Sequence, residues 1–199
     1  MNLPNSLTVV RMFLVPLLVV VLLTEFEARQ ILGISKELVG AAIFALASIT
    51  DWLDGYLARR RRQVTWIGQM LDPIADKLLT SAAFISLVQL GLAPAWMVAL
   101  IIGREFAITA LRSLAYTKGI TIPASPLGKI KMVSQVTCIL LLIVGWGPLP
   151  WLAPLGRLAL WVVMLTAVVS AADYYRRFQR LLNARVTDVN VARTTRKAS

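Results

Sequence analysis

Hydrophobic residues along the chain fall into six long runs, and the connections between them, together with the C-terminal tail, carry most of the charged residues. The runs cover about residues 7–24, 38–58, 72–90, 94–114, 132–146 and 157–174. A helix needs roughly 20 mostly apolar residues to cross the hydrocarbon core of a bilayer. The pattern therefore predicts an all-α integral membrane protein with six transmembrane helices.

The charges in the connections predict how these helices are oriented. Basic residues collect at 59–62, at 112–131 and in the tail, whereas the turns at 91–94 and 147–156 carry no charge. Basic connections usually stay on the cytoplasmic side of a membrane, so we expect both termini to be cytoplasmic. Residues 1–180 are expected to form one membrane domain. Residues 181–199 are expected to form a basic cytoplasmic tail, partly disordered near its end.

Composition supports a membrane protein and excludes several kinds of chemistry. Of the 199 residues 58% are hydrophobic, the mean hydropathy is +0.72, and the net charge is +11. Because the basic residues lie between apolar runs, they indicate positive-inside topology and attraction to anionic lipids or phosphate substrates, not nucleic acid. The chain has no histidine, which excludes histidine-ligated zinc and Ser-His-Asp triads. The single cysteine, Cys138, is expected to be buried in an apolar run.

Four aspartates beside apolar sequence are the strongest candidates for chemistry: Asp51, Asp54, Asp72 and Asp76. The first two are three residues apart and the last two are four apart, so each pair lies on one face of a helix. Carboxylates beside lipid are costly unless cations compensate them, and hard divalent cations prefer oxygen ligands. Two structural alternatives are a solvated loop between helices and a cap in which Asp72 precedes Pro73.

The aspartates belong to a longer motif, D-x2-D-G-x2-A-R-x8-G-x3-D-x3-D, which resembles the motif of the CDP-alcohol phosphatidyltransferases. Its eight fixed positions are all filled, by Asp51, Asp54, Gly55, Ala58, Arg59, Gly68, Asp72 and Asp76. Segments 1–11, 103–112 and 126–131 are similar to the bacterial phosphatidylglycerophosphate synthases within this family. The likeness covers roughly residues 1–180.

The resemblance implies a six-helix enzyme, usually a homodimer, in the bacterial cytoplasmic membrane with its active site facing the cytoplasm. Two divalent cations, Mg²⁺ or Mn²⁺, would be bound by Asp51, Asp54, Asp72 and Asp76, and Asp76 would also act as the general base. The implied reaction joins CDP-diacylglycerol and sn-glycerol 3-phosphate to give phosphatidylglycerophosphate and CMP by direct displacement.

The resemblance also implies two groups of substrate-binding residues. CDP-diacylglycerol would contact Asn5, Thr8, Gly55, Ala58, Arg59, Thr65 and Gly68, and the phosphate of glycerol phosphate would contact Arg104, Arg112, Lys129 and Lys131. Structural alternatives exist for several of them. Asn5 or Ser6 could cap the first helix, Gly68 could be a turn glycine, and Arg104 could form an internal pair with Glu105.

Three other functions are compatible with parts of the sequence. The same chemistry could use inositol phosphate, serine or phosphatidylglycerol as the acceptor. An intramembrane prenyltransferase also uses aspartate pairs and magnesium, but generally carries two separated acidic motifs and more helices. A cation transporter or channel would place its carboxylates near the middle of the bilayer, whereas here they lie at one edge, beside four arginines.

Overall fold

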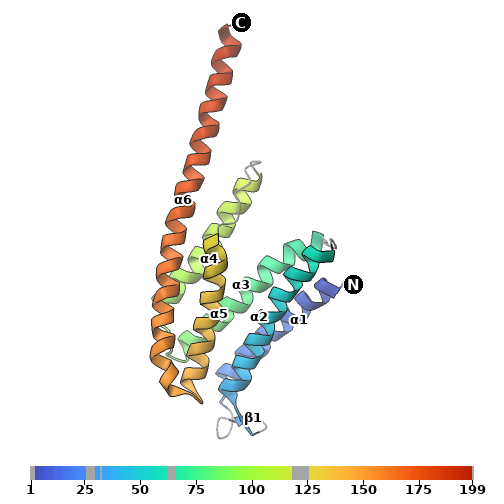
Figure 1. Cartoon of the computed structure of the whole chain (residues 1–199), viewed down its shortest axis with the longest axis vertical. Coiled ribbons are helices and arrows are strands. Elements are labelled where there is room, and N and C mark those ends of the chain that lie inside the picture. The colour runs from blue at the N-terminus through green and yellow to red at the C-terminus, as the bar shows by residue number, and fades with distance from the viewer. Residues whose placement is uncertain (1–2, 26–29, 32, 62–65, 118–125, 199) are drawn as a thin grey trace.

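The computed structural model describes residues 3–25, 30–31, 33–61, 66–117 and 126–198 and is almost entirely helical (Figure 1). Each of the six predicted helices is present in these residues. They are α1 (Leu3–Leu23), α2 (Lys36–Arg61), α3 (Trp66–Gln89), α4 (Ala95–Thr117), α5 (Pro126–Trp146) and α6 (Ala153–Ala198).

The helices form two groups that meet along the middle of the molecule. Helix α1 packs along both α2 and α3, while α6 packs against α5 and α4. The groups are joined where α5 contacts α2 and α3 and where α3 contacts α4. A continuous core of buried apolar side chains crosses this junction and includes Phe44, Phe84, Ile101, Ile139 and Leu160.

The two ends of the helix bundle differ, and we name them by what they carry. At the hairpin end, strands β1 (Gln30–Ile31) and β2 (Ile34–Ser35) pair antiparallel between α1 and α2. Gly33 turns this hairpin with φ 79, a conformation that glycine adopts easily. At the motif end, α2 finishes and α3 begins, close to the N-terminus (Figure 1). The sequence predicted an all-α chain with a loop at 25–37, and two-residue strands are too short to show a hydropathy pattern.

Three helices extend further than the apolar runs predicted. Helix α3 begins at Trp66 instead of near Asp72, and α5 begins at Pro126 instead of near Met132. Proline suits the first turn of a helix because its missing N–H has no intrahelical partner there. Helix α6 continues through Ala198, so the prediction of a partly disordered tail was wrong. The extensions of α5 and α6 carry more charge than the runs they prolong, whereas residues 66–71 of α3 are mostly apolar and were left out of the third run.

Within the described residues, one helical stretch is long and apolar enough to cross a membrane. It covers Pro150–Arg176, 27 residues with a mean hydropathy of 1.9. Shorter apolar helical segments cover Val10–Leu23, Lys77–Gln89 and Lys131–Trp146. Large hydrophobic side chains such as Phe13 and Val169 are well exposed on the outer faces of the helices, as expected where lipid is the solvent.

Candidate active site

The backbone places the four aspartates at matching depths on two consecutive helices. Asp51 lies ten residues before the end of α2, and Asp76 lies ten residues after the start of α3. At 1.5 Å per residue, each is roughly 15 Å along its helix from the connection between α2 and α3. Asp54 and Asp72 lie seven and six residues from the same connection. Both pairs therefore belong to the motif end of the bundle.

This placement removes the structural alternatives for the motif. The aspartates lie within helices, so the loop interpretation was wrong. Asp72 lies six residues inside α3 and cannot be its N-cap, and Gly68 is likewise helical. Helix α1 begins at Leu3, so Asn5 and Ser6 are inside its first turn and not at the cap position.

Many of the predicted ligands have a described backbone but no described side chain. In α1 these are Asn5 and Thr8; in α2 Asp51, Asp54, Gly55, Ala58 and Arg59; in α3 Gly68, Asp72 and Asp76; and in α5 Lys129. Thr65 lies outside the described residues. The metal-binding, catalytic and nucleotide-binding roles of this group stay predictions.

Two of the four predicted phosphate ligands meet in a cluster of charged side chains between α4, α5 and α6. Lys131 of α5 forms an ion pair with Oε1 of Glu105 on α4. Arg104 donates from Nη1 to the same oxygen at 3.0 Å, and its Nη2 donates to Oγ of Ser170 on α6. We call Arg104, Glu105, Lys131 and Ser170 the Glu105 cluster. The internal Arg104–Glu105 pair, which was the structural alternative for Arg104, is present, but it is only part of this arrangement.

The Glu105 cluster is largely buried, and polar atoms without a described partner lie beside it. It combines two cations with one carboxylate, and Lys131 is only 5% exposed. Nε of Arg104 and the hydroxyl oxygen of Tyr174, one turn beyond Ser170, are buried without a hydrogen-bond partner in the described part of the chain. Buried polar groups without partners are costly. A bound phosphate would supply both negative charge and acceptor oxygens here.

Arg112 extends this cationic surface toward the motif end. It lies two turns beyond Arg104 on α4, and its guanidinium carbon is 5.9 Å from the centroid of the Tyr174 ring on α6. Its side chain is exposed. The structure therefore gathers three of the four predicted phosphate ligands, Arg104, Arg112 and Lys131, where α4, α5 and α6 meet.

Sequence reasoning missed two polar residues beside the predicted phosphate ligands, and it assigned no role to a buried arginine on α1. Ser170 and Tyr174 lie four residues apart on α6 and face the basic residues of α4. Two polar groups at this spacing in an apolar run could have been recognised as one helix face. Arg11 of α1 is completely buried, three residues from Thr8. A buried arginine in an apolar helix is a functional signal that the sequence already contained.

Comparison with known proteins agrees with the motif. The family model for CDP-alcohol phosphatidyltransferase matches residues 1–171. The chain is 44% identical to the CDP-diacylglycerol–glycerol-3-phosphate 3-phosphatidyltransferase of Bacillus subtilis (strain 168), over 88% of this chain and 94% of that protein. It is 34% identical to the protein of the same name from Rickettsia bellii (strain RML369-C), over 88% of this chain and 94% of that protein.

A third relative carries a related description. The chain is 38% identical to a probable phosphatidylglycerophosphate synthase of Mycobacterium tuberculosis (strain ATCC 25618 / H37Rv), over 90% of this chain and 82% of that protein. The family match covers most of the chain and contains the whole aspartate motif on α2 and α3. The chain therefore belongs to the CDP-alcohol phosphatidyltransferase family.

Proposed function

We propose that this protein transfers the phosphatidyl group of CDP-diacylglycerol to sn-glycerol 3-phosphate, forming phosphatidylglycerophosphate and releasing CMP. The observation that carries the proposal is that the two aspartate pairs lie at matching distances along α2 and α3 from the connection between these helices. The Glu105 cluster supports an acceptor that carries its own phosphate. The names of the relatives from Bacillus subtilis and Rickettsia bellii describe the same reaction.

The proposed setting is the bacterial cytoplasmic membrane, crossed six times, with both termini and the motif end in the cytoplasm. The basic residues at 59–62 and 112–131 favour this orientation. Residues 1–180 would be the membrane domain, and the basic segment 181–199 would continue α6 into the cytoplasm. The active form would be a homodimer, as in the family.

The donor atoms of the motif suit two divalent cations, Mg²⁺ or Mn²⁺. Asp51, Asp54, Asp72 and Asp76 would hold them, because carboxylate oxygens are the ligands that hard cations prefer. When bound, such cations neutralise the diphosphate of the CDP-lipid and stabilise the charge on departing CMP.

The chain's own residues would then align the two substrates. Asp76 would accept the proton of the glycerol 1-hydroxyl as that oxygen attacks the phosphatidyl phosphorus, and the bond to CMP would break. Arg59 would bind the diphosphate, since a guanidinium matches phosphate oxygens in pairs. Asn5, Thr8, Gly55, Ala58, Thr65 and Gly68 would line the nucleotide site. The glycerol phosphate would be held by Arg104, Arg112, Lys129 and Lys131.

A panel of acceptors tests this function directly. Purified protein with CDP-diacylglycerol should release CMP with glycerol 3-phosphate, and much less with inositol phosphate, serine or phosphatidylglycerol. Chelation of divalent cations should stop the release, and Mg²⁺ or Mn²⁺ should restore it. Release with inositol phosphate or serine and none with glycerol 3-phosphate would contradict the acceptor. Cation flux in proteoliposomes without CMP release would indicate a transporter.

A further inference from the structure

A pocket of about 480 Å³ lies at the hairpin end, between the turn that joins α3 to α4 and the first turns of α6. The turn 91–94 and Trp96 of α4 line one side, and Arg157 and Trp161 of α6 line the other. Among the described residues that line the pocket, Arg157 carries the only charge. None of the residues proposed to bind metals or substrates belongs to it, so the pocket is separate from the candidate active site.

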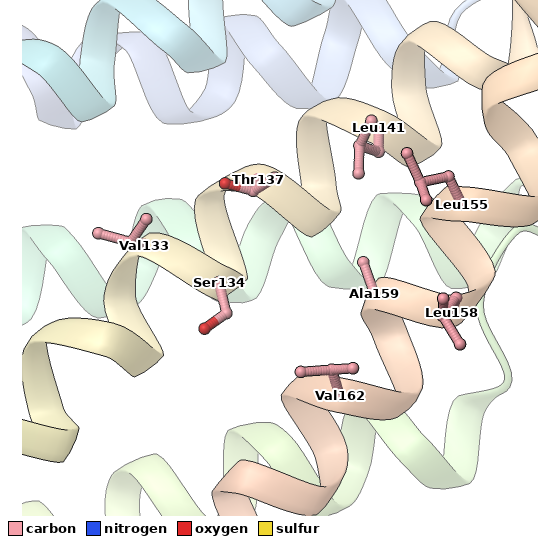
Figure 2. A pocket seen from close by; sticks show the side chains of 8 residues that line it. All are labelled: Val133, Ser134, Thr137, Leu141, Leu155, Leu158, Ala159 and Val162. Atoms are coloured by element: carbon pink, nitrogen blue, oxygen red, sulfur yellow. The ribbon is translucent and has the colours of Figure 1, made fainter.

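The pocket differs in chemistry from a larger groove on another face of α6. That groove, of about 640 Å³, lies between α5 and α6, and Leu158 and Val162 are among the α6 residues that line it (Figure 2). None of the described residues that line the groove is charged. Arg157 and Trp161 each precede one of these two residues, so they lie about 100° around the helix from them. The charged face of α6 is therefore the one that meets the turn 91–94.

The guanidinium of Arg157 is a cation whose side chain has no partner in the described part of the chain. It is exposed, and it makes no hydrogen bond or ion pair with the described residues. The turns at this end of the bundle, 91–94 and 147–156, contain no charged residue. A guanidinium matches the oxygens of a phosphate in pairs, and no described carboxylate lines the pocket to hold an ammonium group. The charge of the pocket therefore favours an anionic phosphate.

Two tryptophans indicate that the pocket lies at the depth of lipid headgroups. The ring centroids of Trp96 and Trp161 are 6.0 Å apart, with their planes at 68°, and each side chain is about half exposed. Tryptophan is enriched where the hydrocarbon of a bilayer meets its headgroups. Arg157 lies four residues after the start of α6, roughly 6 Å along the helix. A long cationic side chain at this position reaches the lipid phosphates.

The floor of the pocket is fixed by the end of α3. Gly91 has φ 71, a conformation that glycine adopts easily. The backbone N–H groups of Leu92 and Ala93 donate to the carbonyl oxygen of Leu87 at 2.9 and 3.3 Å. Because these backbone donors already have acceptors, Arg157 is the group of the pocket that can donate to a bound anion.

We infer that this pocket binds the phosphodiester of an anionic phospholipid in the leaflet opposite the active site. Arg157 donates to the phosphate oxygens, and the rings of Trp96 and Trp161 contact the glycerol and the first carbons of the acyl chains. A lipid is favoured over a soluble phosphate because the cation lies beside these rings and beside exposed apolar side chains such as Leu158. The inference goes beyond the proposed function and rests on the proposed membrane setting alone.

Photolabelling of the whole protein in detergent tests the site. Phosphatidylglycerol with a diazirine at the start of one acyl chain should label peptides 91–97 and 157–161. Arg157→Gln should lower this labelling about tenfold or more at subsaturating lipid, because a hydrogen bond from a charged group is lost. Arg157→Lys should keep part of it. Arg176→Gln is the matched control, since Arg176 is an exposed arginine at the other end of the apolar part of α6, and it should leave the labelling unchanged.

Competition identifies the occupant. Excess unlabelled phosphatidylglycerol should suppress the labelling, and phosphatidylcholine or inorganic phosphate should suppress it much less. Equal suppression by phosphatidylcholine, or full suppression by inorganic phosphate, would overturn the assignment to an anionic lipid. Equal labelling of Arg157→Gln and the wild type would overturn the role of Arg157. A disulfide between two copies of Trp161→Cys would place a second protein chain at the pocket and would also overturn the inference.

CMP release by the same preparations separates this inference from the proposed function. Arg157→Gln should release CMP as the wild type does, because the pocket lies at the opposite end of the bundle from the aspartate motif. Release by the wild type without labelling of the two peptides would overturn the lipid site and leave the function standing. Labelling of the two peptides without release would contradict the function and support the lipid site.

Discussion

Lys36 and Lys131 are two buried lysines near opposite ends of the bundle, and their surroundings differ. Lys36 is 4% exposed. Its Nζ donates to the carbonyl oxygens of Leu22 at 3.3 Å and Thr24 at 3.0 Å, where α1 ends, and lies 5.2 Å from the centroid of the Trp146 ring. Lys131 is about as buried, but it pairs with a carboxylate that Arg104 shares.

The difference shows which buried charge serves the fold and which can serve a ligand. Every described contact of Lys36 is to backbone or ring atoms that tie α1, α2 and α5 together at the hairpin end. The surroundings of Lys131 contain a second cation, Arg104, and two buried polar atoms without a described protein partner. Burial is the same for both lysines, so what distinguishes them is the kind of group that each contacts: backbone carbonyls and a ring for Lys36, and a shared carboxylate for Lys131.

The largest effect expected at the motif end is that of Asp76→Asn. The amide cannot accept the proton of the acceptor hydroxyl, so kcat should fall about 100- to 10,000-fold. The melting temperature in detergent should stay near that of the wild type. Asp188→Asn, in the extension of α6, is the control and should retain activity. Activity like the wild type in Asp76→Asn would refute the role of Asp76 as the base.

Exchanging each lysine for methionine tests whether Lys36 serves folding and Lys131 serves binding of the acceptor. Lys131→Met should raise the KM for glycerol 3-phosphate about tenfold or more, because a hydrogen bond to a charged group contributes about 1.5–3 kcal/mol. Lys36→Met should leave that KM unchanged. It should instead lower the free energy of unfolding by about 1–3 kcal/mol, since buried carbonyls lose their donor. Steady-state kinetics and thermal unfolding of the same preparations check both.

The reverse result would contradict the roles assigned to Lys36 and Lys131. If Lys36→Met changed the KM for the acceptor while Lys131→Met changed only stability, the hairpin end would hold the functional charge. Lys131→Arg is the conservative variant, and it should recover part of the acceptor affinity because it keeps the cation beside Glu105.

Arg112→Ala should have the smallest effect of these changes. Its guanidinium is exposed and lies over the Tyr174 ring, where a cation–π contact contributes about 0.5–1 kcal/mol. The KM for glycerol 3-phosphate should rise severalfold, and the KM for the CDP-lipid should change less. A change confined to the KM for the CDP-lipid would remove Arg112 from the acceptor site.

Much of the fold could be read from hydropathy, because an apolar run long enough for a membrane helix is a local property of the chain. All six helices were predicted, and the motif spacing placed each aspartate pair on one helix face. The errors lie where a helix outlasts its apolar run, as at Pro126 and Ala198. Backbone hydrogen bonds continue a helix into polar sequence, where hydropathy no longer marks it.

The candidate site was predictable in part. Arg104, Arg112 and Lys131 were expected to act together, and the structure gathers them, but Ser170 and Tyr174 were not expected. Their roles depend on the packing of α6 against α4, which pairs residues 66 and 62 positions apart in the chain. A local pattern carries no information about such a pairing.

The sequence by itself determined the six helices, the helical register of the four aspartates and the family to which the chain belongs. The tertiary structure decided the roles of the other charges. It enclosed Lys36 among carbonyls and a tryptophan ring, and it brought Lys131, Glu105 and Arg104 together from two helices. The physical reason is that the cost of a buried charge depends on its neighbours in space, and only helix packing selects those neighbours.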